Sequence, residues 1–297
     1  MASDQGPIVQ SLLLRTELVR LRNDLDLTQE VVARSLDWHP SKIMRIEGGK
    51  SKIATTDLRA LLDEYGVKSE SRRERLEVLA QGARKSGWWA EYRGVVDEAS
   101  LTFIGYEAGA SVIRHFQNTV IPGPLQTRDY GRALMSSIVE DKDEGDERKV
   151  EFRLRREKEL EQRAKPPRRF YLLDEAVIRR HVGVDSDPDI MPAQLRYVAD
   201  LAADDPRITV RVIPFSKGAH AGMGGPFVLL EFDGGLAEML YREASSAWHA
   251  QSAITSEDDT VTDYQAAFES ITELALSPEE SITMLRAAAD ELGSSIS

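Results

Sequence analysis

Three polar side chains share one face of a short predicted helix: Ser41, Lys42 and Arg45. The opposite face carries Ile43 and Ile46, which predicts that this side of the helix is buried. Hydroxyl, ammonium and guanidinium groups at this spacing can bind base edges and phosphates in the major groove. The alternative is an ordinary solvated helix face, but the surrounding pattern favours contact with double-stranded DNA.

Signals that begin and end helices lie on both sides of these residues. Pro40 suits the first position of a helix, and Gly48 and Gly49 suit its end. Asp37 lies in the preceding turn, where a left-handed backbone is needed that Asp tolerates. The apolar spacing predicts a compact all-helical bundle with helices at 9–23, 28–36, 40–47 and 56–65.

Further polar residues border the predicted helix at 40–47. Lys50 and Lys52 follow its end, and His39 precedes its start. Either lysine could hold a phosphate, or both could be solvated cations without a role. His39 could hydrogen-bond to a phosphate or to the backbone, or it could act as a pH-sensitive switch. We include these three residues and Pro40 in the predicted DNA-binding surface.

Composition limits the class of protein. The chain has 297 residues and no cysteine, which excludes disulfides and thiolate metal sites and suits a reducing compartment. No apolar run approaches the roughly 20 residues that a membrane span needs, and the first ten residues lack the features of a secretory signal. We therefore expect a soluble cytoplasmic protein, associated with the nucleoid, without a membrane partner.

The net charge of -12 argues against indiscriminate binding of nucleic acid. Residues 1–65 are nearly neutral, with nine Lys and Arg against ten Asp and Glu. Within this span a few cations gather around the predicted helix at 40–47. A small basic patch on an acidic chain suits specific docking, and we expect a homodimer.

The chain divides into three segments. Residues 1–67 hold the predicted helix-turn-helix bundle, and residues 68–105 a charged connector helix with an aromatic cluster. Trp88 and Trp89 belong to this cluster, which we expect to dock on the next domain. Residues 106–297 mix β-rich and helical segments, so the predicted fold class is α+β, with a small mixed sheet. Strands are predicted at 111–121, 168–174, 208–214, 226–232 and 237–243.

Two parts of the predicted α+β domain could bind a ligand or a partner. Residues 148–169 hold ten Lys and Arg against four Asp and Glu. Arg155 could pair there with a carboxylate or a phosphate, or the segment could be a solvated helix with internal ion pairs. His220 lies in a glycine-rich loop at 218–225 that could border a pocket, and Phe227 follows this loop. The loop lacks the pattern of a nucleotide-binding loop.

An enzyme is the competing class of protein. The five histidines are scattered without the HExxH pairing of a zinc site, and no GxSxG elbow is present. No pair of carboxylates has the spacing of an acid–base couple. We therefore expect no catalytic residues, metal or cofactor, and we keep an enzyme or a protein-interaction module as the alternative.

The N-terminal motifs resemble the XRE-type helix-turn-helix family of bacterial and phage repressors. The resemblance rests on Leu27-Thr28-Gln29-Glu30, Ala33, Ser41-Lys42-Ile43, Arg45-Ile46-Glu47 and Gly49-Lys50. It implies that Gln29 holds phosphate and recognition-helix side chains. It also implies a buried ion pair between Arg22 and Glu47. Asp37 and His39 depart from the usual turn Gly and the usual Ser or Thr cap, which leaves the start of the recognition helix open.

The remaining motifs resemble the C-terminal domain of actinobacterial antitoxin-like (WhiJ-like) regulators. They include Gly87-Trp88-Trp89, Val120 to Thr127, Arg153, Arg155 and Arg156, Ile213-Pro214-Phe215, and Gly225-Pro226-Phe227. The resemblance implies a transcriptional regulator, often encoded beside a small acidic partner protein. We take Trp88, Trp89, Arg155, His220 and Phe227 as candidates for binding such a partner or a small-molecule effector. A dimer would read a palindromic operator with half-sites about 34 Å apart.

Overall fold

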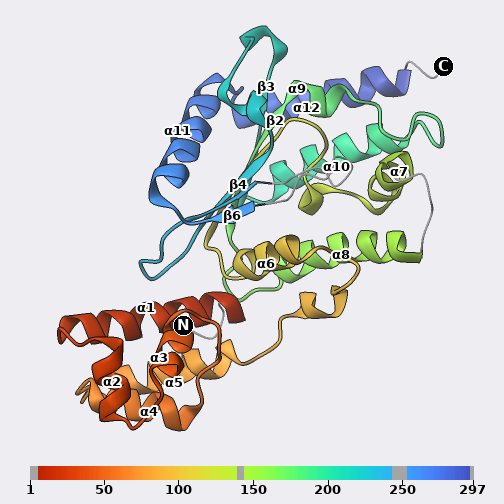
Figure 1. Cartoon of the computed structure of the whole chain (residues 1–297). Coiled ribbons are helices and arrows are strands. Elements are labelled where there is room, and N and C mark those ends of the chain that lie inside the picture. Colours follow the sequence, from red (N-terminus) through yellow and green to blue (C-terminus); the bar gives the residue numbers. More distant parts are fainter. Residues whose placement is uncertain (1–5, 139–143, 243–252, 295–297) are drawn as a thin grey trace. The chain divides into compact units, whose positions relative to one another are not determined.

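The computed structural model describes residues 6–138, 144–242 and 253–294, in two compact units (Figure 1). The first unit comprises Met1–Glu91, Gly105–Gly109 and Gly234–Leu236. The second comprises Tyr92–Ile104, Ala110–Asp233 and Ala237–Ser297. The predicted fold class, a helical bundle followed by a mixed α/β domain, is confirmed.

The first unit is a bundle of five helices around one apolar core. The helices are α1 (Pro7–Asp24), α2 (Gln29–Ser35), α3 (Pro40–Glu47), α4 (Thr55–Glu64) and α5 (Glu70–Ala83). Their buried side chains recur every three or four residues, as amphipathic helices require. The core includes Leu14, Leu18, Leu21, Val32, Ala33, Ile43, Ile46, Leu58, Leu61, Leu62, Leu76 and Leu79.

Helix α5 lies in this bundle, whereas the sequence analysis placed it in a connector. Leu76 and Leu79 are 1% and 2% exposed, and both belong to the core of the first unit. Arg72 on α5 also pairs with Glu17 on α1 at 2.6 Å. The apolar stripe of α5 is narrow, because Val78 points into solvent. This explains why its sequence resembles a solvated linker more than a core helix.

The aromatic cluster after α5 is divided between the two units. Trp88 and Trp89 pack edge to face, with ring centroids 6.0 Å apart, and both belong to the first unit. Tyr92 belongs to the second unit, where its ring lies 5.0 Å from that of Phe152. Each part therefore contributes to the packing of its own unit.

The second unit is built on a six-stranded mixed sheet with the order β3-β2-β1-β4-β5-β6. The strands are β1 (Val112–Gln117), β2 (Arg168–Asp174), β3 (Ile208–Ile213), β4 (Phe227–Glu231), β5 (Met239–Arg242) and β6 (Ala253–Thr255). Strands β1, β2 and β3 are parallel, and the other pairings are antiparallel. Gly234 and Gly235, which lie between β4 and β5, both have positive φ.

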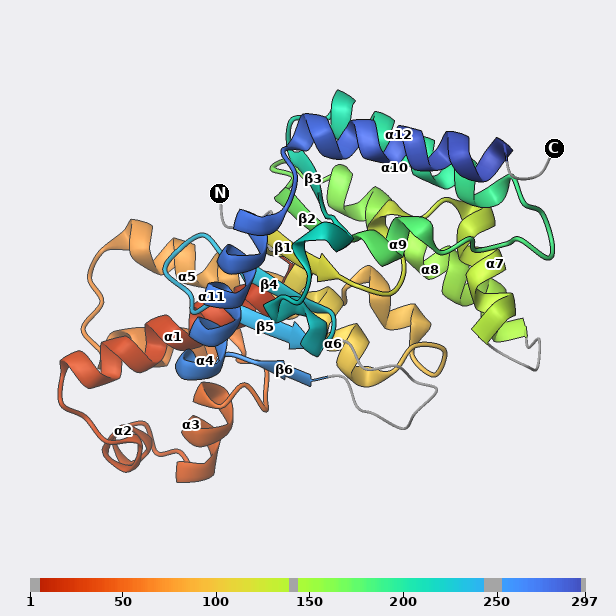
Figure 2. The same cartoon turned by 90° about the horizontal axis from the view of Figure 1, so that it is seen from above.

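Helices cover both faces of the sheet (Figures 1 and 2). Side chains alternate along each strand, so Tyr171 and Leu173 enter one core and Leu172 enters the other. Helix α11 (Asp258–Leu274) packs on the Leu172 face through Phe268 and Ile271. The opposite core takes side chains from α7 (Arg128–Ile138), α9 (Glu175–Arg179), α10 (Ile190–Asp204) and α12 (Pro278–Ser294).

The free edge of β3 is closed by the segment that joins α11 to α12. Leu276 donates its backbone N–H to the carbonyl of Val212 at 2.9 Å. The backbone N–H of Val212 donates to the hydroxyl of Ser281 at 3.0 Å. Arg211 also donates to the carbonyls of Ala275 and Leu276 at the end of α11. The backbone N–H and C=O of Val212 are therefore both hydrogen-bonded, so another strand cannot pair with this edge there.

Helix α8 (Glu144–Glu161) carries a half-buried carboxylate at Glu157. The hydroxyl of Tyr197, on α10, donates to this carboxylate at 3.1 Å. Burial raises the pKa of Glu157 to about 7, against the lowering effect of the Tyr197 hydrogen bond, and the charge of Glu161 also raises it. Near neutral pH, Glu157 therefore titrates within the folded unit.

We expect the Glu157→Gln variant to gain stability over the parent as pH rises. The raised pKa means that folded Glu157 holds its proton more tightly than the unfolded chain does. This contribution is complete below the unfolded pKa and is lost as pH rises through about 7. The neutral amide avoids the loss. After allowance for partial exposure, we expect the stability of the variant relative to the parent to be about 1–2 kcal/mol greater at pH 8.5 than at pH 4.

Denaturant unfolding of both proteins at the two pH values measures this difference. Glu269→Gln is the matched control, because Glu269 is exposed on α11. The assignment to Glu157 fails if both variants show the same dependence on pH.

Candidate nucleic-acid interface

Helices α2 and α3 are joined by a tight turn that aligns α3 on the surface of the first unit. The side chain of Thr28 accepts a hydrogen bond from the N–H of Val31 and caps α2. In the turn the N–H of Trp38 donates to the carbonyl of Ala33 at 2.7 Å. Asp37 has φ 52°, so the left-handed backbone predicted there is confirmed.

His39 begins α3 in the role that Ser or Thr has in most helix caps. Its Nδ1 accepts a hydrogen bond from the N–H of Ser41 at 3.2 Å and lies 2.8 Å from the Ser41 hydroxyl. The helix then starts at Pro40 and ends at Glu47, the bounds predicted for it. An imidazole nitrogen can accept in this way only without its proton. The structure thus gives His39 a backbone-facing role at the start of the helix.

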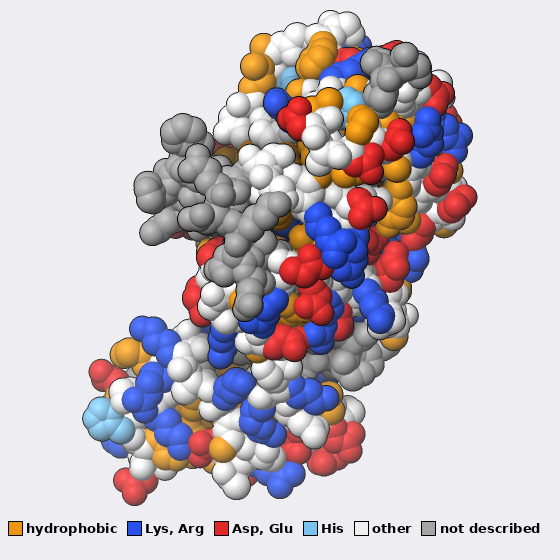
Figure 3. Space-filling view, turned by 90° about the vertical axis from the view of Figure 1, so that its right-hand side faces the viewer, with side chains coloured by type: hydrophobic (Ala, Val, Ile, Leu, Met, Phe, Trp, Pro, Cys, Tyr) orange, Lys and Arg blue, Asp and Glu red, His pale blue; other side chains and the backbone are white. Residues whose placement is uncertain are grey.

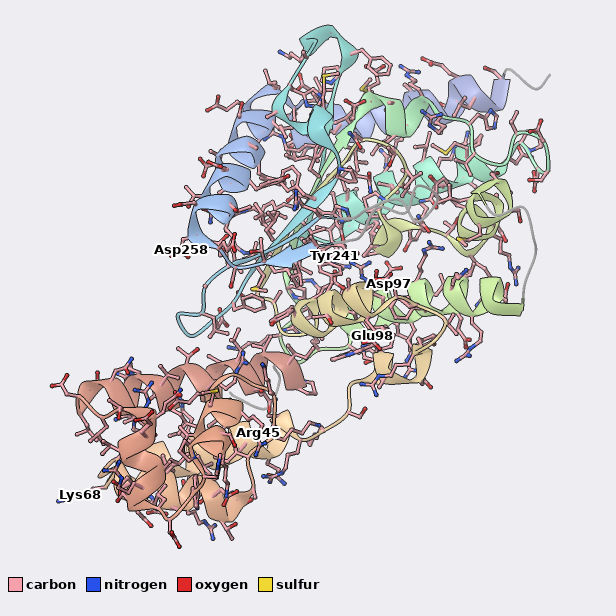
Figure 4. The ribbon with its side chains drawn as sticks, viewed as in Figure 1. Arg45, Lys68, Asp97, Glu98, Tyr241 and Asp258 are labelled. Carbon is pink, nitrogen blue, oxygen red and sulfur yellow. The ribbon has the colours of Figure 1, made fainter. Side chains whose placement is uncertain are left out.

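The two faces of α3 differ in exposure. Ile43 and Ile46 are 1% and 4% exposed and pack into the core. Arg45 is exposed, Ser41 is half-buried, and Met44 is 61% exposed. Figure 4 labels Arg45 on this helix. The exposed face therefore combines a guanidinium, a hydroxyl and an apolar side chain.

Lys42 is held by the fold more tightly than its neighbours on α3. Its Nζ lies 2.8 Å from the Asp57 carboxylate on α4 and 3.7 Å from the centre of the Trp38 ring. Its side chain is 32% exposed. To reach DNA, this ammonium group would have to leave both contacts. Lys42 was grouped with Arg45 from its spacing on α3, because Asp57 lies 15 residues away and no local pattern reveals it.

The lysines that follow α3 differ from each other. Lys50 is exposed, and its amine has no hydrogen bond or ion pair within the described parts of the chain. The Nζ of Lys52 instead donates to the carbonyl of Arg84, at the end of α5, at 3.0 Å. A cation at this position is favourable for the carbonyl end of a helix. The structure thus ties Lys52 to α5 and leaves Lys50 open to solvent.

Gly49 allows the backbone after α3 to pass close to the side chain of Arg15. Its φ is +71°, and a Cβ at this position would lie 1.8 Å from Nη1 of Arg15. Any other residue would combine backbone strain with displacement of the guanidinium. Gly49 therefore fixes the path of the segment that presents Lys50.

A bonded triad joins the ends of three helices. The guanidinium of Arg22 donates to both oxygens of Glu47, at 2.8 and 3.0 Å, and to the carbonyl of Leu27 at 2.7 Å. The amide of Gln29 donates to Glu47 at 2.6 Å. The hydrogen bond that Arg22 donates to Glu47 raises the pKa of Arg22, against the lowering effect of its burial. The triad therefore fixes the end of α3 against α1 and the start of α2.

Cationic side chains of the first unit are spread over the face seen in Figure 3, among several acidic ones. The exposed face of α3 is thus one part of a surface that carries both positive and negative charges. Arg45 on this face and Lys50 just after it are exposed cations without partners among the described residues, as are Arg34, Lys68 and Arg75 elsewhere in the unit. A localised pair of open cations suits a docked complex better than general binding of polyanions.

The five candidate residues of the predicted C-terminal site belong to different elements, and they are divided between the two units. Arg155 pairs with Glu159, one turn away on α8, at 3.3 Å. His220 and Phe227 both pack against the ring of Phe116 and are buried. Trp88 and Trp89 belong to the first unit. In the second unit, His220 and Phe227 are parts of the packed interior.

His220 also links the loop that follows β3 to the end of β2. Its Nε2 lies 3.0 Å from the carboxylate of Asp174, and its Nδ1 accepts from the N–H of Gly222. Only 3% of its side chain is exposed. These contacts fasten the glycine-rich loop to the sheet, so the imidazole is not presented to solvent.

A small cavity lies elsewhere on the sheet of the second unit, beside α11. Its volume is about 220 Å³, and its lining is mainly apolar. None of the five predicted candidates lines it. The lining residues include Phe170, Leu172, Thr209, Arg211, Phe268 and Thr272.

Among the described residues, no group of three His, Asp or Glu side chains is arranged to hold a metal ion. No helix in the described ranges has the length and apolar character to cross a bilayer.

Two family models match the chain. Residues 100–287 match a model described as a domain of unknown function, DUF5753, which covers more than half of the chain. Residues 13–76 match a model described as a helix-turn-helix domain. This second match extends into α5 as far as Leu76, the first core residue of that helix. No curated protein and no solved structure matches the chain.

Proposed function

This chain belongs to the family defined by the DUF5753 domain, and we propose that it is a sequence-specific transcriptional regulator of the XRE type. The match of residues 13–76 to a helix-turn-helix domain carries the proposal. The exposed face of α3 supports it, because Arg45 is free there to bind a base edge. Localisation in the cytoplasm, at the nucleoid, follows from this role.

The proposed readout assigns different tasks to the residues around α3. Arg45 contacts a guanine edge, and Ser41 contacts a base or a phosphate. Lys50 contacts the phosphate backbone. Gln29 and His39 act mainly by holding α3 in position, since both side chains are bonded to α3 residues. Pro40 sets the start of the helix that enters the groove.

We propose that the protein acts as a homodimer on a palindromic operator. Two copies of α3 would then enter successive major grooves, about 34 Å apart. The net charge of -12 supports this arrangement, because two localised contacts suit an acidic protein better than a long basic surface.

The second unit is proposed to have a regulatory role, without enzymatic activity. In an antitoxin-like (WhiJ-like) regulator of actinobacterial type, a small acidic partner protein or a small molecule would modulate DNA binding. The ten Lys and Arg of residues 148–169 support an acidic partner, because their field attracts negative charge.

A genome-wide footprint of the tagged full-length chain tests this function. We expect sharp occupancy at sites that share a palindromic motif, with half-sites one helical turn apart. Selection of duplexes from a random pool by the purified chain should return the same motif. Diffuse occupancy together with no enriched sequence would contradict the proposal.

A further inference from the structure

Met44 is an apolar side chain on the exposed face of α3. Ser41, Met44 and Arg45 follow i, i+3, i+4 spacing, so their side chains are neighbours on the helix surface. Met44 is 61% exposed, whereas Ile43 and Ile46 pack into the core from the opposite face. Met44 therefore has no part in the core of the free protein.

Single exposed apolar residues are common on protein surfaces and need no special role. Met44 differs in its position, because it lies directly beside Arg45 on the helix that the proposed function places in the major groove. Lys42 is turned to Asp57 and Trp38, with 2.8 Å to the first and 3.7 Å to the ring centre of the second. The face left for base contact is thus formed by Ser41, Met44 and Arg45.

We propose that Met44 is a specificity-determining residue that contacts the C5-methyl group of a thymine. This inference rests on the proposed function. Thymine presents a methyl group in the major groove, and apolar side chains recognise it by direct contact. The unbranched thioether of Met adapts to such a surface. An apolar side chain at this place has no hydrogen bond to offer the polar edges of the other bases.

The position of this thymine follows from the spacing along the helix. Adjacent residues of an α-helix advance by about 1.5 Å along its axis, and successive base pairs rise by about 3.4 Å. Adjacent residues on α3 thus reach base pairs that lie at most one or two steps apart. Each half-site is therefore predicted to hold a thymine within about two base pairs of the guanine bound by Arg45.

Replacement of thymine by uracil tests the contact, because it removes the methyl group and keeps the pairing edge. A duplex is first selected with the full-length chain, and each thymine is then replaced in turn. For the parent protein we expect one position in each half-site where uracil lowers affinity about three- to ten-fold. The Met44→Ala variant should bind the thymine and uracil duplexes equally at that position.

Two further variants make the test specific. Met44→Gln keeps the length of the side chain and introduces an amide, so it should shift the preferred base at this position towards adenine. Met223→Ala removes another exposed Met, which is 68% exposed in the second unit, and should leave the uracil profile unchanged. Equal melting temperatures of the parent and the Met44 variants confirm that each remains folded.

Two results overturn the inference while leaving the proposed function intact. In the first, uracil has no effect at any thymine of a duplex that is still selected. In the second, Met44→Ala keeps the full sensitivity to uracil. Failure to select any motif would instead overturn the proposed function, and the inference with it.

Discussion

Replacement of Glu47 by alanine is expected to lower the free energy of unfolding of the first unit by about 3–5 kcal/mol. The side chains of Arg22 and Glu47 are 13% and 6% exposed, so water cannot replace the lost carboxylate. Arg22 would keep its bond to the Leu27 carbonyl but lose two charge-assisted bonds. Gln29 would lose its acceptor as well. A half-buried guanidinium without its carboxylate partner accounts for most of the cost.

Chemical denaturation of the parent and the variant, followed by far-ultraviolet circular dichroism, measures this loss. Glu77→Ala is the matched control, because Glu77 forms an ion pair of similar length with Arg59, at 2.7 Å. That pair is exposed, at 58% and 30%, and its removal should cost about 0–1 kcal/mol. Similar losses in the two variants would show that burial of the Arg22–Glu47 pair does not decide its energy.

Arg45→Ala is expected to reduce specific affinity by about 5- to 150-fold, or roughly 1–3 kcal/mol. The side chain is exposed and has no hydrogen bond or ion pair within the described residues, so its loss should leave the fold intact. The missing guanidinium leaves the polar edge of its base without a partner. The effect should therefore appear in the ratio of operator binding to binding of a random duplex.

Arg45→Lys separates charge from geometry at this position. Lysine keeps the positive charge but cannot form the two parallel hydrogen bonds of a guanidinium. We expect it to retain affinity for random duplex and to lose most of the discrimination. Arg75→Ala, which removes an exposed cation of α5, should leave the ratio of operator binding to random-duplex binding unchanged. If Arg45→Ala binds operator and random duplex in the parent ratio, Arg45 has no part in base readout.

The sequence predicted the local features of the candidate interface well. Pro40, Asp37 and the isoleucines of α3 act through their own backbone and their immediate neighbours, and spacing alone reveals such effects. The contacts of Lys42 and Lys52 depend on Asp57 and on the end of α5, which lie 15 and 32 residues away. No local pattern encodes these partners. Met44 was not among the predicted contacts, because only polar side chains of α3 were considered for base contact.

The second unit was predicted in outline, since its strand-rich segments and intervening helices are evident from composition. Strand β6 was not predicted, because it has only three residues, Ala253–Thr255. The burial of His220 also could not be predicted. A glycine-rich loop that follows a strand suggests an open pocket. Asp174 is brought to this loop by the pairing of β2 with β3, and Phe116 by the pairing of β1 with β2. Long-range packing decided these features.

The closure of the β3 edge determines the order in which the parts of the chain can fold during synthesis. The core of the first unit is drawn from residues 14–80 and is available as soon as that stretch has left the ribosome. In contrast, Val212 can form its edge hydrogen bonds only after Leu276 and Ser281 have been synthesised. The core of the second unit that includes Tyr171 is complete only after Leu285 and Ala289. The nascent protein can therefore form the helical core of the first unit while the β3 edge of the sheet is still unpaired.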